Sequence, residues 1–195
     1  EVPVLNRYYG VFESGKIKVR GIEAVRRDTP PLIKKAQMDM IRVLAKAPNS
    51  EAFMKRIPEA VEVLRGYVER LRKRDVDVHD LIIAKQLSMH PDRYAHDVFQ
   101  AIAAKQLLEG GIEVSEGQTV RYLIIDTENR RPSKRVKAAE LIDVETRFDV
   151  EKYVEMLILA GANILSPFGY TQERLRDHIV YGEKQMMLTP ILRTT

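Results

Sequence analysis

Residues 7–28 read RYYGVFESGKIKVRGIEAVRRD, and this stretch decides how the chain begins to fold. Two runs rich in aromatic and β-branched residues flank a turn-forming sequence at 13–16, where Gly15 can adopt a backbone angle that other residues rarely take. Apolar and cationic side chains alternate along residues 17–20. The pattern predicts a β-hairpin with one apolar face and one cationic face, and the cationic face requires water or an anion.

Two helices are predicted directly after the hairpin. The sequence Asp28-Thr29-Pro30-Pro31 is a good helix start, because a short polar side chain can cap the helix and Pro31 loses no N–H that the helix needs. Apolar residues then recur at helical spacing until residues 48–50 break the pattern. A second apolar stripe starts at Pro58, which we expect in the first turn of its helix because proline disrupts a helix interior.

Short strands and a third helix are expected in the middle of the chain. Residues 81–84 (LIIA) are a short buried strand candidate, and residues 119–125 follow a turn and are rich in strand-forming side chains. Between them, Asp97 is a candidate cap for a helix that would end at the two glycines 110–111.

The last third of the chain predicts a basic loop and then helices. Residues 129–137 hold five lysine and arginine side chains together with proline and serine, so we expect a mobile basic loop. Asp149 is expected to cap a long helix, and a short helix is expected near 172–176. The predicted fold class is therefore α+β, with an N-terminal β-hairpin followed by a mostly helical domain with short strands.

The composition indicates a globular chain and leaves the kind of partner open. The chain has 195 residues, 45% of them hydrophobic and 31% charged, enough for a sizeable core. No run approaches the roughly 20 apolar residues of a membrane span, and the lack of cysteine fits a reducing compartment, so we expect a cytoplasmic protein without a membrane partner. The net charge of +4 is compatible with a polyanionic partner but also common in proteins that bind no nucleic acid.

Several short motifs occur in the order found in family B DNA polymerases. Residues 7–9 (RYY), 20–23 (RGIE) and 25–28 (VRRD) resemble the K-x-Y and R-G-x-E-x-V-R-R-D motifs at the end of the palm and the entry to the thumb. Residues 111–122 resemble a thumb pattern of that family, and residues 149–170 resemble its last helix. The resemblance covers nearly the whole chain and implies an archaeal-type polymerase.

The resemblance implies a set of DNA-binding residues. Arg7 and Tyr9 take the K-x-Y positions, which in the family hold the primer strand near its growing end, and arginine in place of lysine adds a fork suited to phosphate. Arg26, Arg27 and Asp28 take the R-R-D positions. There an arginine guanidinium can reach the DNA backbone, and the Asp28 carboxylate can orient that guanidinium or cap the helix. Lys85, Tyr94 and His96 fall where the family's thumb approaches the minor groove of the duplex. The implied DNA-binding residues are Arg7, Tyr9, Arg20, Arg26, Arg27, Asp28, Lys85, Tyr94, His96 and Tyr122.

Each of these assignments has a structural alternative. The pair Arg26 and Arg27 is also what a solvated helix entrance looks like, and Tyr9 and Tyr122 are also typical of half-buried strand aromatics. The basic run is more typical of a solvated surface than of a specific site. Residues 99–101 (FQA) replace the family's Pro-His-Val, so the contact made there in the family is not implied for this chain.

The catalytic aspartates of the family lie upstream of all these motifs. The resemblance therefore implies no catalytic residue in this chain, no cofactor bound by it, and Mg²⁺ held by an upstream polypeptide that carries exonuclease, palm and fingers. Residues 123–128 (LIIDTE) resemble the family's metal-binding strand, but they follow the R-R-D motif, so we interpret Asp126 and Glu128 as a strand end. An enzyme that uses these two carboxylates remains an alternative. The four histidines show no ligand spacing, so we expect no metal site.

The C-terminal tail resembles the sliding-clamp peptide of archaeal family B polymerases. Its Q-x-x-hydrophobic-x-x-hydrophobic-hydrophobic pattern uses Gln185, Leu188, Ile191 and Leu192, although the usual aromatic pair is absent and a frayed tail is the alternative. The implied organisation is a palm-end hairpin at 1–27, a thumb at 28–180 and a tail at 181–195. The predicted function is the thumb-bearing part of a replicative polymerase that grips primer-template DNA. A free-standing DNA-binding or scaffold protein is the alternative.

Overall fold

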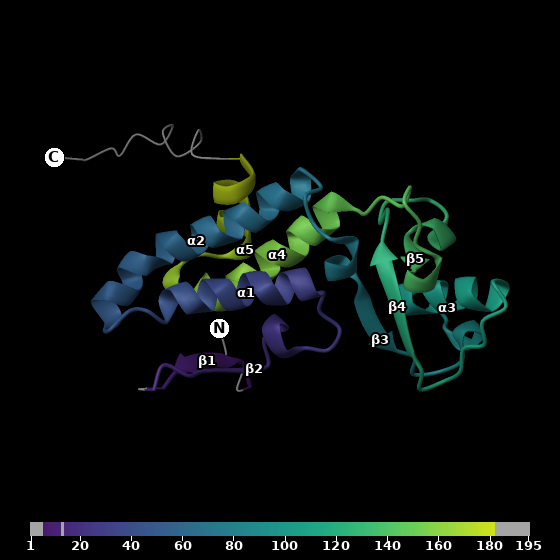
Figure 1. The fold of residues 1–195 in the computed structure, drawn as a ribbon, viewed down its shortest axis with the longest axis horizontal. Coiled ribbons are helices and arrows are strands. Elements are labelled where there is room, and N and C mark those ends of the chain that lie inside the picture. Colours follow the sequence, from purple (N-terminus) through teal and green to yellow (C-terminus); the bar gives the residue numbers. More distant parts are fainter. Residues whose placement is uncertain (1–5, 13, 182–195) are drawn as a thin grey trace.

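A hairpin, a helical bundle and a sheet lobe make up residues 6–12 and 14–181, the part of the chain that the computed structural model describes (Figure 1). The bundle consists of α1 (Pro31–Leu44), α2 (Ser50–Arg72), α4 (Val150–Leu165) and α5 (Gln172–Arg176). The sheet lobe consists of β3 (Ile83–Gln86), β4 (Thr119–Ile124), β5 (Val136–Ala138) and α3 (Phe99–Glu109). Short 3₁₀ helices lie at Glu23–Val25, Val78–Leu81, Pro91–Arg93, Pro132–Lys134, Ala139–Leu141 and Ser166–Phe168, and a π-helical turn at Asp177–Tyr181. This architecture confirms the predicted α+β class.

The N-terminal hairpin forms as predicted. Strand β1 (Tyr8–Val11) pairs antiparallel with β2 (Ile17–Arg20), and Figure 1 shows both strands beside α1 and apart from the sheet of the other lobe. The hairpin leaves through Gly21, whose φ of +69° belongs to the left-handed region, and a Cβ there would collide with the carbonyl of Asn6. The next residue, Ile22, is 2% exposed and anchors the hairpin exit in the core.

The core of the bundle lies between α1, α2 and α4, which pack against one another. Each helix buries one apolar stripe, as the spacing of apolar residues predicts. In α4, Gly161 is buried against α2, where a Cβ would overlap with the side chain of Leu64, so glycine permits the close approach of the two helices.

Helix α2 begins eight residues earlier than predicted. Asn49 is its N-cap, and the side chain of Asn49 accepts a hydrogen bond from the backbone N–H of Ala52 at 2.9 Å. The expectation that Pro58 lies in the first turn is therefore wrong, because Pro58 lies inside the helix. Pro58 removes one backbone donor, but it and Met54, whose carbonyl loses that donor, are both on the exposed side, where water can bind the carbonyl.

The sheet lobe is a three-stranded antiparallel sheet in the order β3-β4-β5. The strand predicted at 119–125 is confirmed as β4. The strand predicted at 81–84 is shifted, because Leu81 ends a 3₁₀ helix and pairing with β4 begins at Ile83. Helix α3 starts later than predicted: its N-cap is Val98, without a side-chain cap, so the expected capping by Asp97 is wrong.

Strand β5 (Val136–Ala138) begins within the last two residues of the predicted basic loop, so the loop is shorter than predicted and contains a 3₁₀ turn at Pro132–Lys134. Helix α3 explains why so short a strand forms. The Gln106 side-chain amide donates to the carbonyls of Ser133 and Val136, both at 2.9 Å, and accepts from the N–H of Ala138 at 2.8 Å. These bonds satisfy the outer edge of the strand, which would otherwise need water or a further strand.

The buried Tyr153 of α4 and the half-buried N-cap of that helix, Asp149, join the bundle to the sheet lobe. The Tyr153 hydroxyl donates to the carbonyl of Leu81 at 2.8 Å and accepts from the N–H of Ile124 at 3.0 Å. Asp149 caps α4 as predicted, through a 3.0 Å bond from the N–H of Lys152. Within residues 6–12 and 14–181, no helix combines the length and apolar character that crossing a membrane requires.

Candidate nucleic-acid interface

A guanidinium–carboxylate fork stands where the chain leaves the hairpin and enters α1. Arg26 Nε lies 3.1 Å from Asp28 Oδ1, and Arg26 Nη2 lies 3.1 Å from Asp28 Oδ2. The hydrogen bonds from Arg26 lower the pKa of Asp28, and the same bonds raise the pKa of Arg26. Because the N-cap of α1 is Pro30 and no side chain caps the helix, Asp28 orients Arg26 and the capping alternative for it is wrong.

The fork lies at the junction between the hairpin exit and the sheet lobe. The charge of Lys85 in β3 adds to the lowering of the Asp28 pKa. Burial first, and then the charge of Asp28, raise the pKa of Tyr122 in β4 to about 12. The charges of Asp28 and Lys85 and the hydroxyl of Tyr122 therefore influence one another electrostatically, although these residues come from segments far apart in the sequence.

Tyr122 has the surroundings of a core aromatic. Its ring is 4% exposed and packs edge-on against Phe99 with 6.2 Å between ring centroids. Tyr122 therefore has almost no exposed surface with which to make the predicted contact with DNA. By contrast, Arg27 and Lys85 are exposed, and neither forms an ion pair with another residue of the described ranges 6–12 and 14–181.

The hairpin presents its predicted site residues on two sides. Arg7 and Tyr9 line a hollow of about 370 Å³ together with residues of α2 and α4, and burial raises the pKa of Tyr9 to about 12. Arg20 lies on the outer, cationic face opposite Tyr8. Lys18 lies 5.9 Å from the Tyr8 ring centroid on that same face.

The sequence pattern indicated the cationic face of the hairpin, but Tyr8 and Lys18 were not among the assigned site residues. The family motif directs attention to Tyr9, which the structure turns inward, while its neighbour Tyr8 is 41% exposed. Strict alternation along β1 was the signal that would have identified Tyr8, because successive side chains point to opposite faces.

Tyr94 and His96 lie on the loop between β3 and α3. The Tyr94 hydroxyl accepts a hydrogen bond from the N–H of Ser88 at 2.9 Å and lies 3.2 Å from its Oγ, and the Ser88 side chain lowers the pKa of Tyr94. His96 is exposed. In the described portion, no hydrogen bond or ion pair links these two residues to the Arg26–Asp28 fork.

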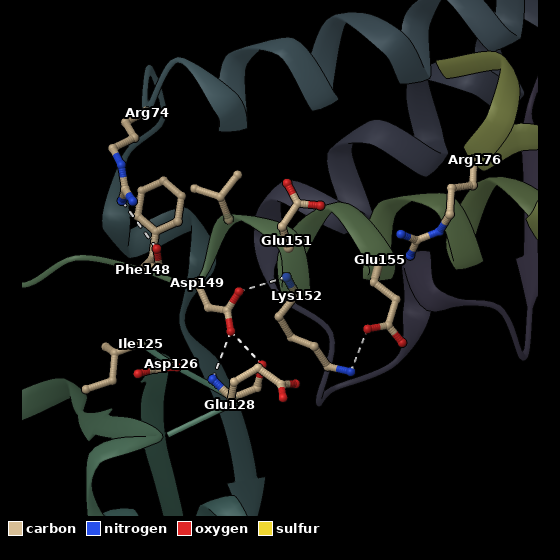
Figure 2. Close-up of a pocket in the computed structure, with 12 residues that line it drawn as sticks. Arg74, Ile125, Asp126, Glu128, Phe148, Asp149, Glu151, Lys152, Glu155 and Arg176 are labelled. Atoms are coloured by element: carbon tan, nitrogen blue, oxygen red, sulfur yellow. Dashed lines mark hydrogen bonds and ion pairs between the residues drawn. The ribbon is translucent and has the colours of Figure 1, made fainter. Parts of the chain in front are cut away.

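The carboxylates Asp126 and Glu128 border a separate hollow of about 550 Å³ between the end of β4 and α4 (Figure 2). Between them, Thr127 donates its backbone N–H and its hydroxyl to Asp149 Oδ2, at 2.9 and 2.6 Å. Asp126 accepts from the side chain of Asn129 at 2.9 Å. Over residues 6–12 and 14–181, no three His, Asp or Glu side chains are placed to hold a metal ion. Both carboxylates follow Ile124, the last residue of β4, so they lie just beyond the end of that strand.

The predicted clamp-binding residues Gln185, Leu188, Ile191 and Leu192 lie outside the described residues. The basic run forms a 3₁₀ turn and β5, and Arg135 in it donates to the carbonyl of Asn129 at 2.9 Å.

Comparisons with known proteins place the chain in one family. The profile described as DNA polymerase family B matches residues 6–168. The DNA polymerase of a Thermococcus species (strain 9oN-7) is 30% identical over 171 residues, which are 87% of this chain and 21% of that protein. DNA polymerase 2 of Aeropyrum pernix is 31% identical over 188 residues, which are 96% of this chain and 22% of that protein.

A solved structure agrees with these sequence matches. The family B DNA polymerase from the hyperthermophilic archaeon Pyrobaculum calidifontis superposes with a TM-score of 0.66 at 30% identity, over 81% of this chain and 20% of that chain. The chain thus spans 20% to 22% of the length of these three proteins. Because the family profile matches most of its residues, the chain belongs to DNA polymerase family B.

Proposed function

We propose that the chain is the thumb-bearing C-terminal part of a replicative family B DNA polymerase and grips the duplex of a primer-template. The observation that carries the proposal is the exposed fork of Arg26 and Asp28, with the exposed Arg27 beside it in the chain and the charge of the exposed Lys85, in the sheet lobe, acting on Asp28. A guanidinium held by a carboxylate keeps a fixed direction, and fixed cations at a junction suit phosphates of a regular duplex. The division into a palm-end hairpin, a thumb and a tail belongs to the same proposal.

The reaction itself belongs to the assembled enzyme in this proposal. An upstream polypeptide would supply exonuclease, palm, fingers and the aspartates that hold Mg²⁺, and the assembled enzyme would work in the cytoplasm. The side chains of residues 6–12 and 14–181 offer no fitting ligand set for the metal, so we assign it no ligand in this chain. What this chain would contribute is the position of the primer end, where small displacements are costly in rate.

Binding to primer-template DNA tests the grip. The logarithm of the affinity should fall with the logarithm of salt concentration at a slope of about −0.9 per phosphate neutralised, nearly independently of sequence. Arg27→Ala and Lys85→Ala should each make the slope shallower by about 0.9 and weaken binding. Lys73→Ala, which removes an exposed charge at the C-cap of α2, outside the proposed interface, is the control and should leave the slope unchanged. Equal slopes for all four proteins would refute the assigned interface.

Primer extension tests the division of labour. The chain alone should extend no primer, and activity should appear when the polypeptide that ends in the palm aspartates is added. Synthesis by the chain alone would contradict the proposal. Failure of the two polypeptides to bind each other, with DNA binding retained, would favour the alternative of a free-standing DNA-binding or scaffold protein.

The tail would add a contact to the sliding clamp. Leu188→Ala should weaken clamp binding in a pull-down or calorimetric titration, because an apolar pocket would lose its occupant. Primer-template binding should stay unchanged in the same variant. Equal clamp affinity of variant and parent would remove the tail from the proposal.

A further inference from the structure

A buried amide holds the hairpin exit to the helical bundle. Gln37 of α1 is 0% exposed and lies on the apolar stripe of that helix, between Ile33 and Met40. Its Oε1 accepts from the N–H of Ala24 at 2.6 Å, and its Nε2 donates to the carbonyl of Ala160 in α4 at 2.9 Å. A polar group at a core position needs such partners, because a buried amide without them destabilises the fold.

The same amide holds a carboxylate that a second amide also binds. Gln37 Nε2 donates to Glu23 Oε2 at 2.7 Å, and Asn163 Nδ2 of α4 donates to Glu23 Oε1 at 2.7 Å. Each carboxylate oxygen thus has its own amide donor. No lysine or arginine in the described ranges lies within 4.0 Å of the Glu23 carboxylate, so the two neutral amides hold it.

These bonds fix the backbone immediately before the fork. Ile22 is buried on one side of Glu23, and the N–H of Ala24 is bonded on the other, while Arg26 follows two residues later. Hydrogen bonds are directional, so they set an orientation that apolar packing alone would leave adjustable. The position of the guanidinium relative to α1 and α4 therefore depends on this network.

We propose that Glu23, Gln37 and Asn163 form a joint that positions Arg26 and Arg27 for the phosphate backbone without touching DNA themselves. These are positioning residues, and the inference rests on the proposed role of the two arginines. Each of the two amides donates one N–H to a different oxygen of Glu23, so the arrangement needs two acceptors at residue 23. In a Glu23→Gln variant the side-chain NH₂ would meet another NH₂, and one of the two bonds would be lost.

The direction in which a Glu23 substitution changes the affinity for DNA distinguishes a positioning role from a simple charge effect. Removing the negative charge of Glu23 should by Coulomb attraction alone strengthen binding to DNA. If the joint positions the fork, Glu23→Gln instead weakens primer-template binding roughly threefold to tenfold and makes the salt slope shallower by about 0.9. Glu62→Gln, an isosteric charge change on the exposed face of α2, is the control and should not weaken binding.

A second substitution should restore the joint. In Glu23→Gln with Asn163→Asp, the new amide can donate to the new carboxylate while its oxygen still accepts from Gln37, and net charge returns to that of the parent. The double variant should recover most of the affinity and the slope. Asn163→Ala, which keeps the net charge and removes one donor, should weaken binding in the same direction and serves if Glu23→Gln does not fold.

The measurements are duplex affinity at several salt concentrations and the urea midpoint, for the full 195-residue chain. Unchanged or tighter binding by Glu23→Gln would overturn the joint. So would a lowered urea midpoint with an unchanged slope, or weaker binding that the double variant does not recover. If Arg27→Ala and Lys85→Ala both bind like the parent, the proposed interface fails. If Arg27→Ala weakens binding and Glu23→Gln does not, only the joint fails.

Discussion

Replacing Asp149 by alanine should destabilise the connection between the bundle and the sheet lobe. The carboxylate accepts three hydrogen bonds: from the N–H of Lys152, as the cap of α4, and from the N–H and hydroxyl of Thr127 after β4. Loss of an N-cap costs about 1 kcal/mol, and loss of bonds to a charged acceptor adds a comparable or larger amount. With part of the site open to water, we expect the free energy of unfolding to fall by about 2–4 kcal/mol.

The effect should appear in the thermal midpoint and in its dependence on pH. For a domain of this size, each kcal/mol shifts the midpoint by about 2–4 °C, so Asp149→Ala should lose roughly 5–15 °C. Burial raises the pKa of Asp149, but the bonds from Thr127 and Lys152 outweigh burial and lower it overall. The stability that this group contributes is therefore present above its unfolded pKa, about 3.9, and is lost as pH falls through the folded pKa. As pH falls through the folded pKa of Asp149, the free energy of unfolding should therefore decrease less in Asp149→Ala than in the parent.

The matched control is Glu151→Ala in the same turn of α4. Glu151 is exposed, and its contact with Arg72 is 3.9 Å long, so its removal should change the free energy of unfolding by less than about 0.5 kcal/mol. A double-mutant cycle of Asp149→Ala with Thr127→Val should give a coupling of about 1 kcal/mol or more. Equal thermal midpoints for Asp149→Ala and Glu151→Ala, or a coupling of zero, would refute the reasoning.

Two further substitutions test other parts of the fold. Tyr153→Phe should lower the free energy of unfolding, measured by urea titration, by about 1–3 kcal/mol. The reason is that the carbonyl of Leu81 and the N–H of Ile124 both lose their hydrogen-bond partner. A change below about 0.5 kcal/mol would show that other groups satisfy them. Gly21→Ala should lower the thermal midpoint, because residue 21 has a left-handed φ and a Cβ there would collide with Asn6. Gly10→Ala is the control and should leave the midpoint unchanged, because there is open space around a Cβ at residue 10. Equal midpoints of the two variants would contradict the strain at Gly21.

Local chemistry was sufficient to predict several elements. The hairpin follows from two strand-forming runs around a glycine turn, and both the cap at Asp149 and the short helix at Gln172–Arg176 follow from neighbouring residues. Helix α2 was misjudged because Pro58 suggested a boundary, while Asn49 supplied a better cap upstream. Proline is tolerated there because its side of the helix faces water, which is a property of the packed bundle.

The order of the short motifs identified the family and the candidate site residues, since a motif is a statement about nearby positions in the chain. Only the tertiary structure decided which of them meet. It placed Lys85 where its charge acts on Asp28, buried Tyr122, left Tyr8 exposed, and let Gln106 complete β5 from a different element. It also joined Glu23 to Gln37 and Asn163, which lie 14 and 140 positions away. Directional bonds across such separations leave no periodic trace in the sequence, because they depend on how the packed helices are placed.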